Sequence, residues 1–294
     1  MNQPLISVIV LTYNHERFIE SCLEGLVQQD YENFEVIVCD DFSEDETWEA
    51  IQSIGDEKDR IRSFRNEENL GPSKNFVFAL EQCKGDFIAL CEGDDLWTDS
   101  SKLSLQMERI SADPSISLVY ADYSKIDDSG KEIAAKVLDE QPEKFELKDM
   151  LSKHGPATNS FLIRKSAFPK KFPAAFYEVL NPDVFIIGYG LHSGKPHFVN
   201  AVLSAHREHD TGIWTSLDRF ERGLIRYSTL VKFYQAIGTR LLEKEALQLF
   251  ERQVILAREK NQEVFQQFFD ELPMSRRWVL GLKWAYANIK DSEN

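Results

Sequence analysis

Short apolar runs alternate regularly with segments of helical periodicity through the first part of the chain. The runs cover residues 6–11, 34–39, 61–65 and 86–91, and apolar residues at helical spacing occupy the stretches between them. Runs of this kind are typical of strands that helices cover on both faces. Strands joined by single helices form a parallel sheet. The sequence therefore predicts an α/β fold with a mostly parallel sheet flanked by helices.

Local signals mark where the intervening helices begin and end. A helix is expected at about residues 17–29, and Ser43 suits the N-cap of the next one. Pro72 suits the first turn of a third helix, which runs through residue 83. A fourth helix is expected at about residues 102–111.

The second half of the pattern is less regular. Residues 116–120 and 158–164 read as strands, and Asp127-Asp128-Ser129-Gly130 is a turn signal inside a hairpin. Residues 183–193 indicate a short helix, and residues 197–203 indicate another strand. These elements are expected to complete the same α/β domain.

Charge divides the chain into two regions. The net charge is −15, of which residues 216–294 contribute +2 and residues 1–215 contribute −17. The change in composition near Trp214 predicts a domain over residues 1–215 and a C-terminal helical extension over residues 216–294. A chain this acidic is not expected to bind nucleic acid, because phosphate binding depends on clustered Lys and Arg.

The four cysteines and the N-terminus indicate the compartment. Cys22, Cys39, Cys83 and Cys91 lie singly in apolar runs without a CxxC pair, which favours buried free thiols over disulfides or a zinc site. The N-terminus carries no basic leader, and no apolar run reaches the roughly 18 residues that span a bilayer. We expect a cytoplasmic protein that is neither secreted nor integral to a membrane.

Polar clusters follow three of the predicted strands at the points where they end. Parallel strands place their carboxyl ends at one edge of the sheet, where ligands bind. No GxGxxG follows the first strand, so a dinucleotide-dependent dehydrogenase is excluded. Crowded carboxylates favour Mg²⁺ or Mn²⁺, and such an ion would carry phosphates that an acidic protein could not otherwise hold. The clusters are Thr12 and Asn14, then Asp40 and Asp41, then Glu92, Asp94 and Asp95.

Four segments, in this order and spacing, resemble the nucleotide-sugar-binding half of GT-A fold, family 2 glycosyltransferases. They read SVIVLTYNHERFIESCL, FEVIVCDDFSEDET, NLGPSKNFVFAL and GDFIALCEGDDLW. The resemblance is strong over residues 5–123 and continues more weakly to about residue 215. It implies a Rossmann-like GT-A domain with a nucleotide-sugar-binding half at residues 1–123 and an acceptor half at residues 124–215.

The resemblance implies roles for the polar clusters on the donor side. Asp40 or Asp41 would bind the uracil or ribose of a UDP-sugar, in a pocket lined by Thr12 and Asn14. Asp94 would lie near the ribose and Asp95 would hold the metal ion. The alternative is that these acids only stabilise turns and cap helices. Asn69 and Asn75 are open between loop stabilisation and donor contact. Glu92 stands where the family more often has Asp, which leaves its contact with the metal in question.

The second half supplies the residues that the family uses on the acceptor side. Asp183 matches the catalytic base, with helix N-capping as the alternative. The segment HREHDTGIW resembles a family motif in which His206 replaces Tyr, and it makes Arg207 a candidate diphosphate contact and His209 a candidate metal or diphosphate ligand. Thr158, Asn159 and Ser160 are expected to face the acceptor.

The resulting expectation is an inverting, metal-dependent enzyme that moves one sugar from a UDP-sugar to the hydroxyl of a glycan or lipid-linked acceptor. The processive Gln-x-x-Arg-Trp signature is absent, which favours a single addition. A sugar-nucleotide nucleotidyltransferase and a non-catalytic nucleotide-sugar-binding module are the alternatives. The basic, aromatic residues 276–290 suit a helix that lies at the inner face of a membrane. The alternative is a helix that packs on the catalytic domain or on a second subunit.

Overall fold

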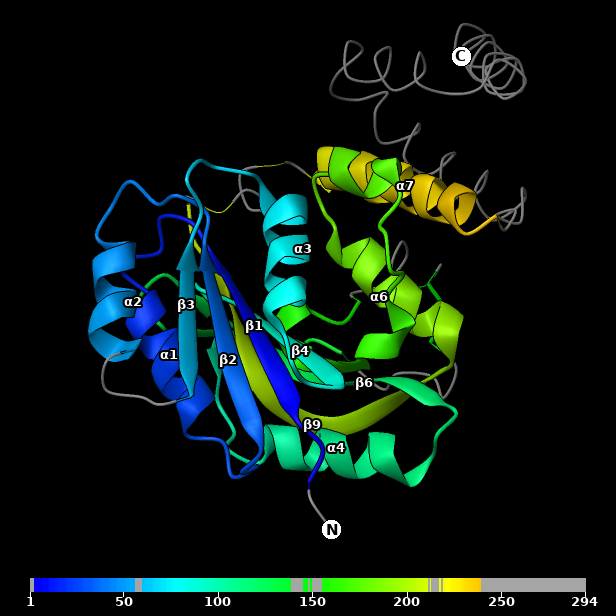
Figure 1. Cartoon of the computed structure of the whole chain (residues 1–294), viewed down its shortest axis with the longest axis horizontal. Coiled ribbons are helices and arrows are strands. Elements are labelled where there is room, and N and C mark those ends of the chain that lie inside the picture. The colour runs from blue at the N-terminus through cyan, green and yellow to red at the C-terminus, as the bar shows by residue number, and fades with distance from the viewer. Residues whose placement is uncertain are drawn as a thin grey trace, which may run out of the picture.

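The computed structural model describes residues 3–55, 60–138, 145–147, 149, 155–210, 212, 217 and 219–238. Within these residues a single nine-stranded sheet is flanked by helices on both faces (Figure 1). Along the main path the strands follow the order β3-β2-β1-β4-β8-β6-β9-β5, and β7 pairs with β6 at the side. The predicted α/β class is confirmed.

The first half repeats the alternation seen in the sequence. Strands β1 (Ile6–Thr12), β2 (Phe34–Asp40), β3 (Ile61–Arg65) and β4 (Phe87–Glu92) pair in parallel. Helices α1 (Ile19–Val27), α2 (Thr47–Gly55) and α3 (Pro72–Gln82) connect them. Pro72 occupies the first turn of α3, where a missing backbone N–H removes no helical hydrogen bond. The carboxyl ends of β1, β2 and β4 therefore lie side by side.

The second half makes the sheet mixed rather than mostly parallel. Its elements are β5 (Leu96–Trp97), α4 (Lys102–Ala112), β6 (Ile116–Asp127), β7 (Glu132–Ala134), η1 (Thr158–Ser160), β8 (Phe161–Arg164), η2 (Lys165–Ala167), η3 (Ala174–Glu178), α6 (Asp183–Ser193) and β9 (Lys195–Glu208). Strand β8 runs antiparallel between β4 and β6, whereas β9 runs parallel to β6 and antiparallel to β5. The long β9 carries residues 206–208 back to the end of β4.

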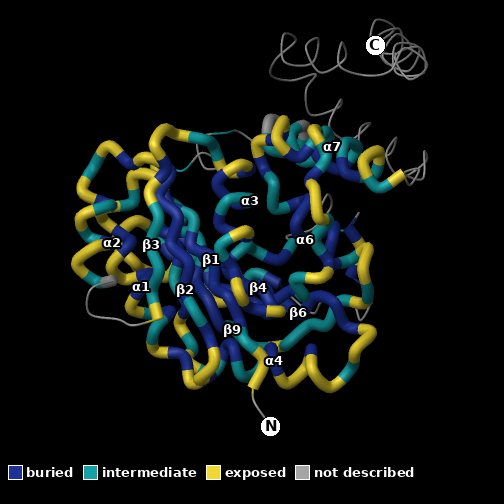
Figure 2. The backbone as a smooth tube through the Cα atoms, in the orientation of Figure 1, coloured by how far each residue is buried: buried dark blue, intermediate teal, exposed yellow. Residues whose placement is uncertain are grey.

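Two hydrophobic clusters lie on the opposite faces of the sheet. Helices α1, α2 and α4 cover one cluster, and α3 and α6 cover the other together with α7 (Arg219–Ala236). The central strands are buried almost throughout, as Figure 2 shows by colour. Strands such as β1 are apolar along their whole length because both of their faces are covered and lose contact with water.

Several local predictions need correction. Ser43 does not cap α2, which begins only at Thr47; it bonds instead to the side chain of Asp40. The strand predicted at residues 158–164 begins at Phe161, because residues 158–160 form the η1 turn. Strands β6 and β9 extend well beyond the predicted segments 116–120 and 197–203. The four cysteines are free and buried, as predicted.

Helix α7 packs against α6 and the segment that precedes it. The ring of Phe233 lies so close to Gly188 of α6 that a Cβ atom there would come within 2.6 Å of it. Thr229 donates a hydrogen bond to the Asn181 side chain just before α6. The predicted boundary at Trp214 and the segment 276–290 lie outside the described residues. In the part of the chain that the structure describes, no helix is both long and apolar enough to cross a membrane.

Lys102, the first residue of α4, is completely buried beside Trp97 of β5. Lys102 is 0% exposed, its Nζ lies 4.1 Å from the centre of the Trp97 ring, and it donates to Gln106 Oε1 at 2.8 Å. Gln106 in turn donates to the carbonyl of Ser160 in η1. Burial lowers the pKa of the Lys102 amine to about 7. The folded protein therefore holds this amine neutral at a pH where the unfolded chain protonates it.

The lowered pKa of the buried amine should make the free energy of unfolding depend on pH, and replacement of Lys102 by Met should remove that dependence. Between about pH 7 and pH 10 the unfolded wild type binds a proton that the folded protein does not, so wild-type stability should rise with pH relative to Lys102→Met. The change across this window is at most roughly 4 kcal/mol. Urea unfolding at pH 7, 8.5 and 10 measures it, and a stability difference that stays constant with pH would contradict the interpretation.

Candidate active site

Backbone hydrogen bonds join the carboxyl ends of the three central strands. The N–H of Gly93 donates to the carbonyl of Leu11, and the N–H of Asp41 donates to the carbonyl of Thr12, both at 2.9 Å. Asn14 adopts a positive φ of 56° and connects the β1 and β2 loops. Its N–H donates to Ser43 Oγ, and its side-chain oxygen accepts from the N–H of Glu44. The predicted polar clusters therefore meet at one edge of the sheet.

Asp40 and Asp41 make the internal contacts of turn residues. Asp40 is 0% exposed and accepts hydrogen bonds from the N–H and Oγ of Ser43. Burial raises the pKa of the Asp40 carboxyl despite these bonds. Asp41 accepts hydrogen bonds from Asn66 Nδ2 and from the N–H groups of Leu70 and Gly71. Both carboxylates make the contacts expected of the turn alternative, and they hold the loops that follow β2 and β3.

Asn69 and Asn75 also stabilise this loop. Asn75 is buried, donates to the carbonyl of Cys39 at 3.0 Å and accepts from Asn66. Asn69 is exposed and accepts from the N–H of Gly71 at 3.1 Å. For Asn75 the contacts favour loop stabilisation. Asn69 keeps an exposed position beside the crevice.

The three acids after β4 separate into different environments. Asp95 is 0% exposed, and its carboxylate accepts from Asn159 Nδ2 at 2.9 Å, from the N–H of Arg207 at 2.9 Å and contacts His206 Nδ1 at 3.0 Å. These partners occupy three of the roughly four lone-pair sites of the carboxylate. Asp95 is therefore placed to join β5 to β9 and η1, which differs from the predicted role as the metal ligand.

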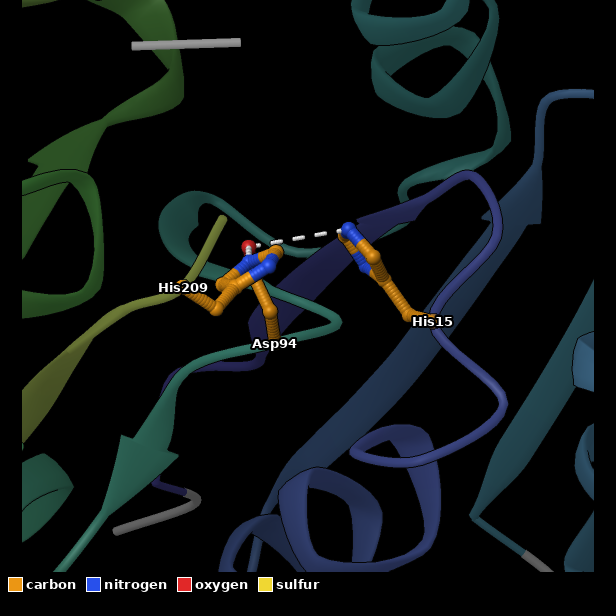
Figure 3. A group of neighbouring side chains, drawn as sticks. All are labelled: His15, Asp94 and His209. Atoms are coloured by element: carbon orange, nitrogen blue, oxygen red, sulfur yellow. Dashed lines mark hydrogen bonds and ion pairs between the residues drawn. The ribbon is translucent and has the colours of Figure 1, made fainter. Parts of the chain in front are cut away.

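Asp94 faces two imidazoles and retains an oxygen without a partner. Its Oδ2 lies 2.9 Å from His209 Nε2 and 3.6 Å from His15 Nε2. Its Oδ1 is buried and has no hydrogen-bond partner among the described residues. Figure 3 shows the two rings approaching Asp94 from different segments of the chain. This is the arrangement expected of a cation ligand, because a buried carboxylate oxygen without a partner is otherwise costly.

The local electrostatics distinguish the acids further. Burial opposes ionisation of Asp94, but His15, His209 and His206 outweigh it and lower the pKa to about 2. Burial, together with the charges of Asp94 and Asp95, raises the pKa of Glu92 to about 8. Burial disfavours the charged form of His206, yet the neighbouring carboxylates raise its pKa to about 9. Negative charge therefore concentrates on Asp94.

Arg207 is engaged by the protein itself. Its side chain is buried and donates to the carbonyls of Asp94, Asp127 and Asp128 at 2.8, 3.2 and 3.3 Å. Its guanidinium also lies 4.8 Å from the centre of the Phe18 ring. These contacts position the loops around Asp94, and they do not match the predicted diphosphate contact.

Asp183 is the first residue of α6. The N-cap of this helix is Pro182, without a side-chain cap hydrogen bond, so Asp183 is not the N-cap, although backbone N–H groups of the first turn interact with its carboxylate. Burial raises the pKa of the Asp183 carboxyl to about 6, against the opposing effects of Arg226 and two backbone N–H groups. Its charge also raises the pKa of Glu92, which places the two carboxylates in one electrostatic environment. A half-buried carboxylate with this pKa is suited to accept a proton.

The expectation that Thr158, Asn159 and Ser160 face an acceptor needs correction for two of them. Asn159 and Ser160 are 0% exposed. Asn159 donates to Asp95 and to the carbonyl of Ala205, and accepts from Ser204. Thr158 is half-buried. Asn159 therefore belongs to the network that holds Asp95.

Sequence reasoning missed two residues of the site, His15 and Tyr13, and the contact that a third, His206, makes with Asp95. His15 and His206 contact the acids, and Tyr13 is 39% exposed at the end of β1. The position of His15 and Tyr13 directly after the first strand was the signal available for them. His206 was recognised only as a replacement for Tyr, because its pairing with Asp95 depends on the long β9.

Among the residues that the structure describes, two sets have ligand atoms close enough to share a metal ion. His15, Asp94 and His209 form one set, and Glu92, Asp94 and Asp95 form the other, with all ligand atoms of each set within 4.8 Å of one another. Asp94 belongs to both sets. The unpartnered oxygen of Asp94 and the supply of carboxylate and imidazole ligands fit a divalent cation.

The chain is similar in sequence to bacterial proteins. An uncharacterized protein of Mycobacterium bovis is 28% identical over 219 residues, or 72% of this chain and 61% of that protein. A UDP-Glc:alpha-D-GlcNAc-diphosphoundecaprenol beta-1,3-glucosyltransferase of Escherichia coli is 37% identical over 103 residues, or 35% of this chain and 40% of that enzyme. The chain thus spans about three-fifths of its mycobacterial relative.

Two solved structures share the fold. TarS of S. aureus, in complex with UDP-GlcNAc, aligns with a TM-score of 0.62 at 20% identity, over 92% of this chain and 77% of that chain. The mannosyltransferase of Pyrobaculum calidifontis, in complex with GDP-Man and Mn²⁺, aligns with a TM-score of 0.60 at 18% identity, over 97% and 81%. Identities this low establish the fold alone.

The family assignment rests on a direct sequence match. The model for Glycosyl transferase family 2 matches residues 7–170, which is more than half of the chain. The match includes β1, β2 and β4 with the polar clusters at their carboxyl ends. The chain has the GT-A fold and belongs to glycosyl transferase family 2.

Proposed function

We propose that the protein is a metal-dependent, inverting glycosyltransferase that moves one sugar from a UDP-sugar to an acceptor hydroxyl. The observation that carries the proposal is an electrostatic interaction between two groups from different halves of the fold. The Asp94 cluster lies at the end of β4, and Asp183, at the start of α6, is close enough to influence the pKa of Glu92. A donor-binding group and a base for the acceptor can thus act on one reaction centre.

The donor nucleotide is assigned to the crevice above β1 and β2. Tyr13 offers an exposed aromatic face on which a base can stack, next to Thr12 and Asn14. Asp40 and Asp41 hold the loops beneath it. UDP is proposed as the nucleotide because the Escherichia coli relative uses UDP-Glc and TarS binds UDP-GlcNAc.

Asp94 and His209 are the residues proposed to hold a divalent cation. When bound, the cation would neutralise the diphosphate and stabilise the charge of the leaving group. Asp95 takes a positioning role in this account, since its oxygens are occupied by Asn159, His206 and the Arg207 amide. The mannosyltransferase bound to Mn²⁺ supports a divalent ion in this fold without deciding between Mn²⁺ and Mg²⁺ here.

Asp183 is proposed as the general base. Inversion by direct displacement requires removal of a proton from the acceptor hydroxyl as that oxygen attacks the anomeric carbon. A carboxylate whose pKa is raised to about 6 remains ionised at neutral pH and is a stronger proton acceptor than an ordinary Asp. Asn181, anchored by Thr229 of α7, fixes the approach to α6 and thereby the position of this base.

The acceptor is proposed to be a glycan or a lipid-linked sugar. Two apolar side chains, Tyr177 and Leu180, are 42% and 44% exposed on the segment that leads to Asp183. An exposed aromatic and aliphatic pair beside the base suits a sugar ring or an apolar carrier. The Escherichia coli relative acts on a diphosphoundecaprenol acceptor, which supports this class. A cytoplasmic location, with residues 216–294 at the inner membrane face or in a homodimer, remains part of the proposal.

Family membership separates this proposal from one of the two alternatives. A nucleotidyltransferase would belong to a different family, and the match to glycosyl transferase family 2 favours sugar transfer. A non-catalytic binding module would share the crevice, but it would not need a base at Asp183. Turnover is therefore the property that distinguishes the remaining possibilities.

Sugar transfer should depend on both Asp183 and a divalent ion. UDP release from a panel of UDP-sugars with Mn²⁺ and a lipid-linked acceptor should fall at least about a hundredfold in Asp183→Asn, the usual contribution of a general base. The matched control Glu178→Gln, at an exposed ion pair with Lys232, should retain activity. EDTA should abolish turnover. Activity that survives EDTA would exclude the metal dependence, and full activity in Asp183→Asn would exclude the base.

The pH profile should report the ionisation of Asp183. Because the base must be deprotonated, kcat/KM should fall as the pH decreases through about 6. Arg226 lowers the pKa of Asp183, so Arg226→Met should move this acidic limb to higher pH, whereas Lys232→Met on the same helix should not. An acidic limb that stays in place in Arg226→Met would show that another group controls it.

A further inference from the structure

His15 lies in the loop between β1 and α1, and it has no role in the proposed transfer reaction. Its carbonyl accepts hydrogen bonds from the N–H groups of Phe18 and Ile19, both at 2.9 Å, at the start of α1. Its own N–H donates to Thr47 Oγ1 at 2.8 Å, at the start of α2. Two helices therefore fix the backbone of His15, and its ring is half-buried against the carboxyl end of β4.

The distances around Asp94 fit three ligands of one ion. Asp94 Oδ2 lies 2.9 Å from His209 Nε2 and 3.6 Å from His15 Nε2, and the ligand atoms of the three residues lie within 4.8 Å of one another (Figure 3). Ligand atoms at about 2.1 Å from a shared ion are about 3.0 Å apart at right angles and about 4.2 Å apart when opposed. The observed spacings require only small side-chain movements to surround an ion.

Unpartnered polar atoms give a second, independent indication of a ligand. Thr12 Oγ1, His15 Nδ1 and Asp94 Oδ1 are buried atoms for which the described residues supply no hydrogen-bond partner. Thr12 is itself only 3% exposed. A Cβ atom on Gly93 would come within 2.7 Å of Thr12 Oγ1 and 2.9 Å of His15 Nδ1, so the glycine leaves room for both groups. A bound ion would satisfy Asp94 and orient the ring of His15.

The competing set of ligands is less suitable. Glu92, Asp94 and Asp95 would form an all-oxygen site of the type that Mg²⁺ favours. However, Asp95 is fully buried and its carboxylate already contacts Asn159, His206 and the Arg207 amide. Breaking this network would cost more than moving the His15 ring, which has an unpartnered nitrogen.

We propose that His15 is the third protein ligand of the metal ion, so that Asp94, His209 and His15 form a two-histidine, one-carboxylate site. This inference rests on the proposed function, which places the ion at Asp94. Two imidazoles bind transition-metal ions more strongly than Mg²⁺, which prefers oxygen ligands and retains water. The site therefore selects a transition-metal ion such as Mn²⁺ over Mg²⁺, and His15 supplies much of that selectivity.

Direct Mn²⁺ binding tests the inference without relying on turnover. The full chain is titrated with Mn²⁺ in the presence of UDP, and free Mn²⁺ is followed by electron paramagnetic resonance. His15→Ala should weaken Mn²⁺ binding at least about tenfold. His15→Gln, which offers an oxygen ligand, should weaken Mn²⁺ binding but preserve or improve the ability of Mg²⁺ to compete. The control His192→Ala, at an exposed residue of α6, should bind Mn²⁺ as the wild type does.

Nitrogen coupling in the pulsed spectrum of bound Mn²⁺ gives a second readout. Wild type should show two coordinated imidazoles, and His15→Gln should show one. Unchanged affinity and two coordinated imidazoles in His15→Gln would overturn the inference while leaving the proposed function intact. A wild-type protein that releases UDP from a UDP-sugar but binds Mn²⁺ without any nitrogen coupling would also overturn it. Absence of Mn²⁺ binding by the wild type would refute both the inference and the metal dependence.

Discussion

Crowding of negative charge at the end of β4 is the constraint on which the site depends. Glu92, Asp94 and Asp95 occupy one tight turn, where burial and mutual repulsion both oppose ionisation. The fold compensates by bringing His206 and His209 from the end of β9 against them. The antiparallel pairing of β5 with β9 places these histidines beside the turn.

Asp94 and Asp95 differ in the contacts that they make. Asp95 is internal, and its bonds to β9 and η1 hold the turn in place. Asp94 keeps one oxygen without a partner and faces the crevice, with His15 and His209 on either side of it. In our proposal, this pair of adjacent aspartates supplies one structural position, Asp95, and one metal-ligand position, Asp94. The difference arises from which side of the turn meets the protein interior.

Helices α6 and α7 connect the second half of the fold to this centre. Asp183 begins α6, and Arg226 of α7 opposes the rise in its pKa that burial causes. Helix α7 is fixed to α6 by Phe233, which packs on Gly188. Part of the region beyond residue 215 therefore contributes charge to the site. In this account, the region beyond residue 215 does more than bind a membrane or a second subunit.

The sequence was most informative where structure depends on local pattern. The apolar runs predicted β1, β2 and β4 closely, and the parallel arrangement then determined that their polar ends meet. It was least informative where a side chain serves a distant partner. Asp41 holds the loop before α3, Arg207 bonds to three carbonyls, and Asn159 supports Asp95, and each depends on sheet pairing that has no local signal. The same limit concealed His15, since an isolated histidine in a loop has no pattern.

The central claim is that Asp94, rather than Asp95, holds the metal ion of this glycosyltransferase. Anomalous diffraction from crystals grown with UDP and Mn²⁺ tests it directly, because the manganese position is read without reference to activity. The account predicts a single strong peak at about 2.2 Å from an oxygen of Asp94 and from His209 Nε2, with Asp95 still bonded to Asn159. A peak coordinated by Asp95, with Asp94 turned away from it, would contradict the account.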